Sequence, residues 1–391
     1  MSPLRSARRP GRMTESVIRE MTRLALDHGA INLSQGYPDF DPPAAITEAA
    51  KRAIDGGENQ YTVTWGYPPL RERLASQYTA QLGWDVDPLR HVSVTCGVTE
   101  GLCAALLATL DPGDEVLVPE PAHDNYRPAC YLADAEPVAV LLGPGGRLDV
   151  ERLAAAVTPR TRAVLLNTPH NPTGRVFDHG ELEALAELCE RHDLLLLTDE
   201  IYDRLVFDGR SHLSPGSLEA LADRTITVSG LGKTFAVTGW RLGYVIAPDR
   251  WASAVHTVHD FLTICAPTPL QAAACAALDL PPEYYRGLVA EYDERRALML
   301  GILSGAGFVA DRPEAAYYVL ADFRGLPVPE ARLDPTSFAR WLTVDVGVAV
   351  VPGDAAYSIE GCGTDVVRFA FCKRLETLHA AGERLQAAFG A

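Results

Sequence analysis

Lysine is scarce in this chain of 391 residues, and positive charge is in deficit. Only Lys51, Lys233 and Lys373 occur, beside many more arginines, and the formal net charge is −16. Phosphate recognition needs clustered positive charge, so this balance argues against a nucleic-acid partner. Because lysines are so few, each one is a candidate functional group.

Long hydrophobic runs are also missing. No apolar run reaches the roughly 18–20 residues that a membrane helix needs, and none follows the arginines near the N-terminus. We therefore expect no membrane association and no secretory signal, and residues 1–13 are predicted to be a disordered lead-in. The eight cysteines form no CxxC pair and no cysteine–histidine metal spacing. A cytoplasmic protein with no metal site is the expectation.

Strands and helices alternate through most of the chain. Continuous apolar strands between helices indicate an α/β fold whose mainly parallel sheet is covered on both faces. Polar loops rich in Gly, Asn, Asp and Lys follow several of these strands, where open α/β sheets bind ligands. The predicted strands lie within residues 91–97, 111–121, 162–174, 194–200, 224–235 and 239–247.

The pattern changes near residue 283, where a long charged helix opens a stretch of shorter α+β elements. We predict a large domain over residues 46–282 and a small C-terminal domain over 283–391. The N-terminal segment, 14–45, begins with an amphipathic helix over 14–28 and is expected to pack with the small domain.

The three lysines differ in their surroundings. Lys51 lies on a solvated helix face, and Lys373 lies among charged residues. Lys233 follows a strand in SGLGKTF, where small neighbours let a planar ligand approach the backbone. A partly desolvated lysine at such a place can form an imine with a carbonyl cofactor. The alternative is a lysine on a surface loop, and the spacing of a nucleotide P-loop is absent.

Three charged side chains fit such a cofactor. Asp199 ends the apolar strand LLLLTDE and suits a buried cation such as a pyridinium nitrogen; a helix N-cap is the alternative. Arg241 offers a fork for a phosphate, or else forms a surface ion pair. Arg368 lies on an apolar strand and needs an anion. That anion is either a substrate carboxylate or a neighbouring acid, Asp365 or Glu360.

Residues 230–243, GLGKTFAVTGWRLG, match the lysine-attachment signature of the class I aminotransferases. The chain resembles this family of pyridoxal-phosphate (PLP) enzymes over nearly its whole length, most closely the kynurenine, glutamine and aromatic transaminase branch, which includes cysteine-conjugate β-lyases. The resemblance implies PLP fold type I: a mainly parallel seven-stranded sheet sandwiched by helices, plus a smaller α+β C-terminal domain. Further similar segments are INLSQGYPDF at 31–40, NQYTVTWGYPPL at 59–70, NTPHNPTG at 167–174, LTDEIYDRLVFDG at 197–209 and VRFAF at 367–371.

The resemblance also implies roles around the cofactor ring. Lys233 would hold PLP as a Schiff base and move the proton between Cα and C4′. Asp199 would hold the proton on the pyridine nitrogen, while Asn171 and Tyr202 would bond the ring's O3′.

Other implied roles concern the phosphate and the substrate. Backbone N–H groups of Gly97, Val98 and Thr99 would bind the phosphate at a helix N-terminus, and Arg241 would neutralise it. Tyr61 would reach the phosphate in the neighbouring subunit, which implies a homodimer with shared active sites. The implied substrate residues are Arg368 for the α-carboxylate, aided by Asn171 and the backbone of Gly36, with Tyr37 and Trp65 as further pocket candidates.

Three positions depart from the family pattern. Gly230 replaces a serine that usually bonds the phosphate, and Ser229 lies one place away. His123 occupies the place of the aromatic residue that stacks on the ring; we expect stacking rather than proton transfer. Thr99 stands where the aromatic-transaminase branch has an aromatic side chain, which argues against kynurenine or phenylalanine as substrates.

The predicted reaction is transfer of the α-amino group of an L-amino acid to a 2-oxo acid by a ping-pong aldimine and quinonoid mechanism. A PLP-dependent lyase is the rival, because the same carbanion could eliminate a β or γ substituent, decarboxylate or couple. A non-enzymatic binding module is disfavoured, because Lys233 is present and residues 1–13 are too short for a DNA-binding extension.

Overall fold

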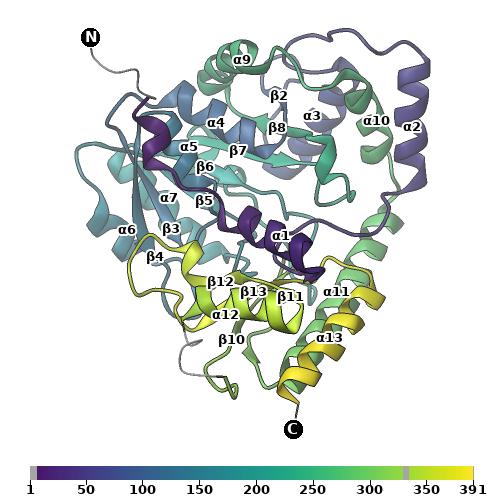
Figure 1. Ribbon diagram of the computed structural model, residues 1–391. Coiled ribbons are helices and arrows are strands. Elements are labelled where there is room, and N and C mark those ends of the chain that lie inside the picture. Colours follow the sequence, from purple (N-terminus) through teal and green to yellow (C-terminus); the bar gives the residue numbers. More distant parts are fainter. Residues whose placement is uncertain (1–6, 329–333, 391) are drawn as a thin grey trace, which may run out of the picture.

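The computed structural model describes residues 7–328 and 334–390. They form a seven-stranded sheet, a four-stranded sheet and a two-stranded sheet, with helices packed against the two larger ones (Figure 1). No described helix is both long and apolar enough to cross a membrane.

The large sheet has seven strands in the order β2-β8-β7-β6-β5-β3-β4. Only β8 runs antiparallel to its neighbours, so the predicted mainly parallel sheet is confirmed. The edge strand β4 was not predicted: most of its side chains are partly exposed, which blurs its apolar signal. The strand bounds are β2 Val92–Thr95, β3 Glu115–Glu120, β4 Glu136–Leu141, β5 Thr161–Asn167, β6 Leu195–Asp199, β7 Thr225–Gly230 and β8 Gly243–Ile246.

Alternate residues of these strands feed separate cores on the two faces of the sheet. Val116 and Val118 pack with helices on one face, while Leu117 packs on the other. Because both faces are covered, the strands are apolar at nearly every position. Helices α4 (Val98–Thr109), α5 (Tyr126–Leu132) and α9 (Asp249–Thr263) contribute to the first core. The opposite cores include α3 (Pro68–Leu82), α6 (Val150–Ala156), α7 (His179–His192), α8 (Glu219–Ala222) and α10 (Thr268–Leu278).

The small sheet is antiparallel, in the order β12-β13-β10-β9, and buries a cluster of aromatic rings. Phe323 and Phe338 stack with their centroids 4.2 Å apart. The predicted boundary at residue 283 lies one residue after the start of α11 and stays a prediction. The bounds are β9 Val309–Ala310, β10 Tyr318–Asp322, β12 Val351–Pro352, β13 Val366–Ala370, α11 Pro282–Gly305, α12 Pro335–Trp341 and α13 Leu375–Phe389.

The N-terminal segment crosses the face of the molecule from the large sheet to the small one (Figure 1). Helix α1 (Val17–His28) leads into β1 (Ile31–Asn32), which pairs in parallel with β11 (Val348–Ala349). Met21 and Leu33 share the aromatic core of the small sheet. The chain then enters the large-sheet side through α2 (Ala44–Asp55).

The predicted disordered lead-in over 1–13 needs a correction in part. Residues Arg9–Arg12 form a short 3-10 helix. Arg9 pairs with Asp134 and Arg12 pairs with Glu136, so this helix contacts the large-sheet side although none of its residues is buried. Residues 1–6 lie outside the described part of the chain.

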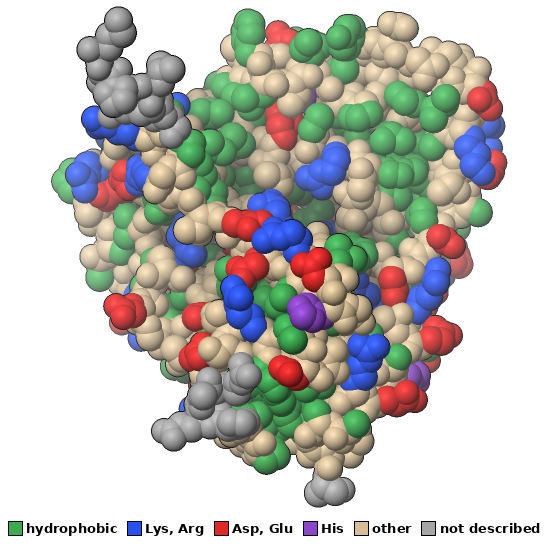
Figure 2. Space-filling view, viewed as in Figure 1, with side chains coloured by type: hydrophobic (Ala, Val, Ile, Leu, Met, Phe, Trp, Pro, Cys, Tyr) green, Lys and Arg blue, Asp and Glu red, His purple; other side chains and the backbone are tan. Residues whose placement is uncertain are grey.

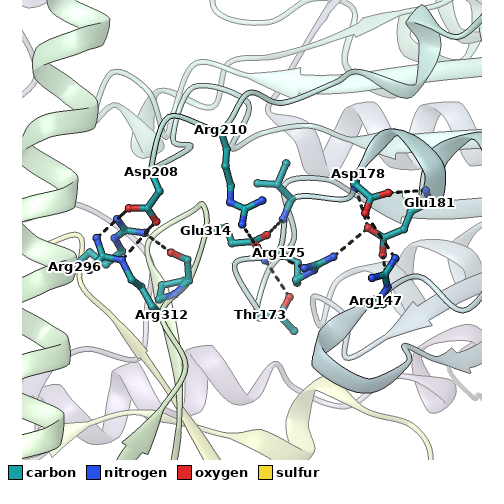
Figure 3. A network of polar contacts seen from close by, with 12 residues as sticks. Arg147, Thr173, Arg175, Asp178, Glu181, Asp208, Arg210, Arg296, Arg312 and Glu314 are labelled. Carbon is teal, nitrogen blue, oxygen red and sulfur yellow. Dashed lines mark hydrogen bonds and ion pairs between the residues drawn. The ribbon is translucent and has the colours of Figure 1, made fainter.

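A network of ion pairs fixes the turn that precedes β10 (Figure 3). Asp208 accepts from Arg296 of α11 at 2.8 Å and from Arg312 at 3.1 Å. Glu314 accepts from Arg210 at 3.0 Å and from the backbone N–H of Val176 at 2.9 Å. These contacts join the loops of the large sheet to residues 312–314, shortly before β10 begins.

Candidate active site

Polar residues collect where four strands of the large sheet end. Asp199 is the last residue of β6, and Gly97, Asn171 and Lys233 follow β2, β5 and β7. These strands run in the same direction, so their carboxyl ends meet at one edge of the sheet. The predicted residues are therefore brought together.

Lys233 is largely enclosed at this edge. Its Nζ donates to the carbonyl of Gly36 at 2.8 Å and lies 5.6 Å from the ring centroid of Tyr317. Burial lowers the pKa of Lys233 to about 8, although Asp199 favours the charged form. An amine with this pKa is partly neutral near neutral pH and can act as a nucleophile. The alternative of an exposed loop lysine is wrong.

Asp199 is buried, with 6% of its surface exposed. Its Oδ2 accepts from the hydroxyl of Tyr126 at 2.8 Å, and its Oδ1 accepts from the N–H of Ile201 at 3.2 Å. Burial raises the pKa of Asp199 to about 6, and these two hydrogen bonds oppose the rise. Asp199 precedes a turn rather than a helix. Tyr126 was not predicted, although it follows His123 by only three residues in EPAHDNY.

Arg368 lies in β13 with 6% of its surface exposed, and its donors meet neutral oxygens. Nη1 donates to Oδ1 of Asn171 at 3.1 Å, and Nη2 donates to the carbonyl of Ser34 at 2.9 Å. Its Nε is buried with no partner among the described residues. The alternative that Asp365 neutralises Arg368 is wrong, because Asp365 lies 3.3 Å from Arg324 instead.

The N-terminus of α4 lies against Arg241. Gly97, the N-cap residue, has a φ of +82°, and a Cβ there would lie 2.5 Å from Nη2 of Arg241. A side chain at position 97 would therefore displace the guanidinium from the free N–H groups of the helix. Arg241 donates to the carbonyl of Thr238 at 3.1 Å. Val98 begins the helix, and Thr99 is exposed on its first turn.

His123 shares a small cavity with Arg368. Ile18 and Asp124 also line this cavity, and most of the remaining wall is apolar. Burial lowers the pKa of His123 to about 4, even though Nδ1 lies 3.5 Å from Oδ1 of Asp124. The imidazole is therefore neutral at neutral pH. This favours the predicted stacking role over proton transfer.

Close packing against a neighbouring backbone segment explains why position 230 is a glycine. A Cβ there would lie 2.9 Å from the carbonyl of Leu242, the residue before the neighbouring strand β8, so a serine would not fit without movement. Ser229 does not substitute for it, because its hydroxyl is buried and donates to the carbonyl of Glu200 at 3.2 Å.

Other predicted residues lie elsewhere within one chain. Trp65 stacks on His256 of α9 with centroids 4.5 Å apart, and does not line the cavity beside Arg368. Tyr61 is 77% exposed. Lys373, expected in ordinary charged surroundings, is buried: its Nζ donates to the carbonyl of Tyr37 at 2.8 Å and lies 3.8 Å from that ring's centroid.

Comparison with known proteins identifies this arrangement. Residues 28–385 match the family model for aminotransferase class I and II. The chain belongs to that family. It is 40% identical to the probable N-succinyldiaminopimelate aminotransferase of Mycobacterium tuberculosis, over 95% of each chain. It is 37% identical to human kynurenine–oxoglutarate transaminase 1, over 94% of each chain.

Solved structures agree with this assignment. The M. tuberculosis N-succinyldiaminopimelate aminotransferase superposes with a TM-score of 0.94 at 39% identity, covering 98% of this chain and all of that one. The methionine aminotransferase of Escherichia coli superposes with a TM-score of 0.92 at 34% identity, with the same coverage. The aminotransferase described here has the PLP fold type I architecture predicted from its sequence.

The aminotransferase uses PLP to move an amino group from an amino acid to a 2-oxo acid. The rival lyase reaction is not favoured, because these relatives are transaminases. The residues present fit the cofactor. The enclosed amine of Lys233, the buried carboxyl of Asp199 and the bare helix N-terminus at Gly97 are the groups that an aldehyde, a pyridine nitrogen and a phosphate require.

Proposed function

We propose that Lys233 is the lysine that binds PLP covalently and then moves the proton between the substrate's Cα and the cofactor. Its lowered pKa and its place beside Asp199 support this role. Asp199 would keep a proton on the pyridine nitrogen, while Asn171 and Tyr202 would hydrogen-bond O3′. When bound, PLP draws into its ring the electron pair left after Cα loses its proton.

The phosphate would lie at the N-terminus of α4. Among the described residues the N–H groups of Val98 and Thr99 have no hydrogen-bond partner, whereas the N–H of Gly97 donates to the carbonyl of Thr95 at 2.8 Å and would have to turn toward the phosphate. The helix dipole at this end favours an anion. Arg241 would supply the positive charge, since its guanidinium already crosses this end of the helix. His123, neutral at physiological pH, would stack on the ring.

The surroundings of Arg368 are the observation that best supports binding of an amino acid. A buried guanidinium with only neutral oxygen partners, and with Nε unpaired among the described residues, lacks its counter-ion. The planar fork matches a carboxylate, and the arginine faces the cavity that His123 lines. The α-carboxylate of the amino acid would complete the ion pair, near Asn171 and Gly36. Tyr37 would line the same site.

Arg368→Met tests this assignment. We expect KM for the amino donor to rise about 100-fold, because a buried charge-assisted pair is lost, while the cofactor still binds. Steady-state kinetics and the visible spectrum of the bound cofactor measure the two effects separately. Arg374→Met removes an exposed arginine nearby and should leave KM unchanged. An unchanged KM in Arg368→Met would contradict the proposal.

We also propose a cytoplasmic homodimer with shared active sites. Exposed apolar side chains at Tyr61, Val63, Phe261, Leu262 and Ile264 support this assembly. They come from the segment between α2 and α3 and from the end of α9. Figure 2 shows hydrophobic side chains gathered over this part of the molecule. Tyr61 would then reach the phosphate of the neighbouring subunit, and Trp65 would lie beside it. The eight free thiols fit a reducing compartment.

Mixed dimers test whether the sites are shared. Lys233→Ala and Tyr61→Ala chains are co-expressed and assayed at a PLP concentration that limits the Tyr61 variant. If each site takes Lys233 from one chain and Tyr61 from the other, each mixed dimer has one intact active site and one site that lacks both residues. Random pairing then restores about a quarter of wild-type activity, well above either homodimer. Activity no higher than the average of the two homodimers, or a monomer in sedimentation, would contradict sharing.

A further inference from the structure

Tyr318 begins β10 and is almost fully buried, at 3% exposure. In the antiparallel pair of β10 and β13 it lies opposite Ala370, and Arg368 is its diagonal neighbour. The guanidinium of Arg368 lies over the Tyr318 ring, 4.3 Å from its centroid. The Tyr318 ring therefore supports one face of the guanidinium of Arg368, the arginine proposed to bind the substrate carboxylate.

The other end of Tyr318 reaches the cofactor side of the site. Its hydroxyl lies 3.2 Å from the hydroxyl of Tyr202. A Cβ on Gly36 would lie only 1.9 Å from the Tyr318 hydroxyl oxygen, so only glycine at position 36 leaves room for this phenol. The absence of a side chain at Gly36 therefore leaves the space that the Tyr318 hydroxyl occupies.

Tyr202 depends on this contact. Its ring packs edge-on against Tyr317 and Tyr318, with centroids 5.3 Å and 6.0 Å away, so the ring is fixed. Within the described residues, Tyr318 is the hydrogen-bond partner of its hydroxyl. The charged groups that act on Tyr202 are Asp199 and Arg368. Either hydroxyl of this pair can be the donor, so the contact with Tyr318 limits the directions in which the Tyr202 hydroxyl donates.

We propose that Tyr318 is a positioning residue that links the two halves of the active site. Its hydroxyl donates to Tyr202 and so directs the Tyr202 proton toward the cofactor's O3′, while its ring holds Arg368 ready for the substrate carboxylate. The inference rests on the proposed roles of Tyr202 and Arg368. A hydroxyl that accepts a hydrogen bond is a stronger donor, so Tyr318 strengthens the bond that Tyr202 makes.

Tyr318→Phe tests the hydroxyl, because it keeps the ring under Arg368. The readout is the pH titration of the visible absorbance of the purified holoenzyme. A donor at O3′ favours the deprotonated chromophore, so weakening it should raise the apparent pKa of that titration by about 0.5 to 1 unit. Tyr202→Phe should raise it at least as much, and the double variant should add nothing to Tyr202→Phe. Tyr292→Phe is the matched control, because its buried hydroxyl has no partner among the described residues.

Tyr318→Leu tests the ring. The probe is 2-aminoisobutyrate, an amino acid without a Cα proton, and its Kd is read from the spectral shift of the bound cofactor. Loss of the cation–π contact should weaken its binding about fivefold to tenfold, whereas Tyr318→Phe should stay within about twofold of wild type. A wild-type holoenzyme without a visible band would contradict the proposed function itself. A band that shifts in Tyr202→Phe but not in Tyr318→Phe, or an unchanged Kd in Tyr318→Leu, would overturn the inference alone.

Discussion

Lys233→Ala should abolish turnover, with kcat/KM lower by about 10⁴-fold or more. The variant loses both the nucleophile that holds the cofactor and the base that moves the Cα proton, and general acid–base catalysis alone contributes up to about 10⁴-fold. The chain offers a close control, since Lys51 is an exposed lysine that pairs with Glu48. Lys51→Ala should keep full activity.

Covalent trapping distinguishes loss of the attachment site from loss of the fold. Borohydride treatment of the wild-type holoenzyme, followed by peptide mass spectrometry, should find the cofactor on Lys233. Lys233→Ala should give no labelled peptide and yet unfold at the same denaturant concentration as wild type. A cofactor label on Lys373, which is buried, would refute the assignment.

Asp199→Asn should lower kcat by about 10³-fold with little change in KM. An amide cannot stabilise a protonated pyridine nitrogen, so the ring becomes a weaker acceptor for the electron pair at Cα. Stopped-flow measurement of the single half-reaction with an amino acid isolates this step from product release. A kcat within tenfold of wild type would show that Asp199 does not serve the ring nitrogen.

The same variant has an opposite effect on the stability of the cofactor-free chain. The pKa of Asp199 is raised from 3.8 to about 6, so the folded chain binds this proton more tightly than the unfolded chain does. That stabilisation is present below pH 3.8 and is lost as the pH rises through 6. At pH 7 the buried carboxylate therefore costs about 3 kcal/mol. Cofactor-free Asp199→Asn should resist urea better than wild type at pH 7, and the advantage should vanish near pH 4. Equal urea midpoints at pH 7 would contradict this.

Sequence patterns predicted six of the seven strands of the large sheet, because buried strands are apolar at nearly every position. They also placed Lys233, Asp199, Asn171 and Gly97 together, because the ends of parallel strands share an edge. The edge strand β4 was missed, since partial exposure weakens its pattern.

Local sequence patterns give little indication of contacts between segments that are distant in the chain. Tyr318 meets Arg368 through strand pairing, and Tyr126 meets Asp199 across 73 residues. Lys373 is buried although its neighbours in the sequence are charged, because its side chain lies over the Tyr37 ring. Such facts depend on register and on tertiary packing, which a periodicity does not determine.

The pairing of β1 with β11 has a consequence for biosynthesis. Residues 31 and 32 leave the ribosome early, but their partners Val348 and Ala349 are made more than 300 residues later. At about 5–20 residues per second, the first strand waits some 15–60 s for its partner. For most of that interval the apolar side of α1, including Met21, lacks most of its core partners, because most of that core comes from residue 288 onward. Docking of α1 and β1 is therefore a late step of folding, which follows synthesis of most of the chain.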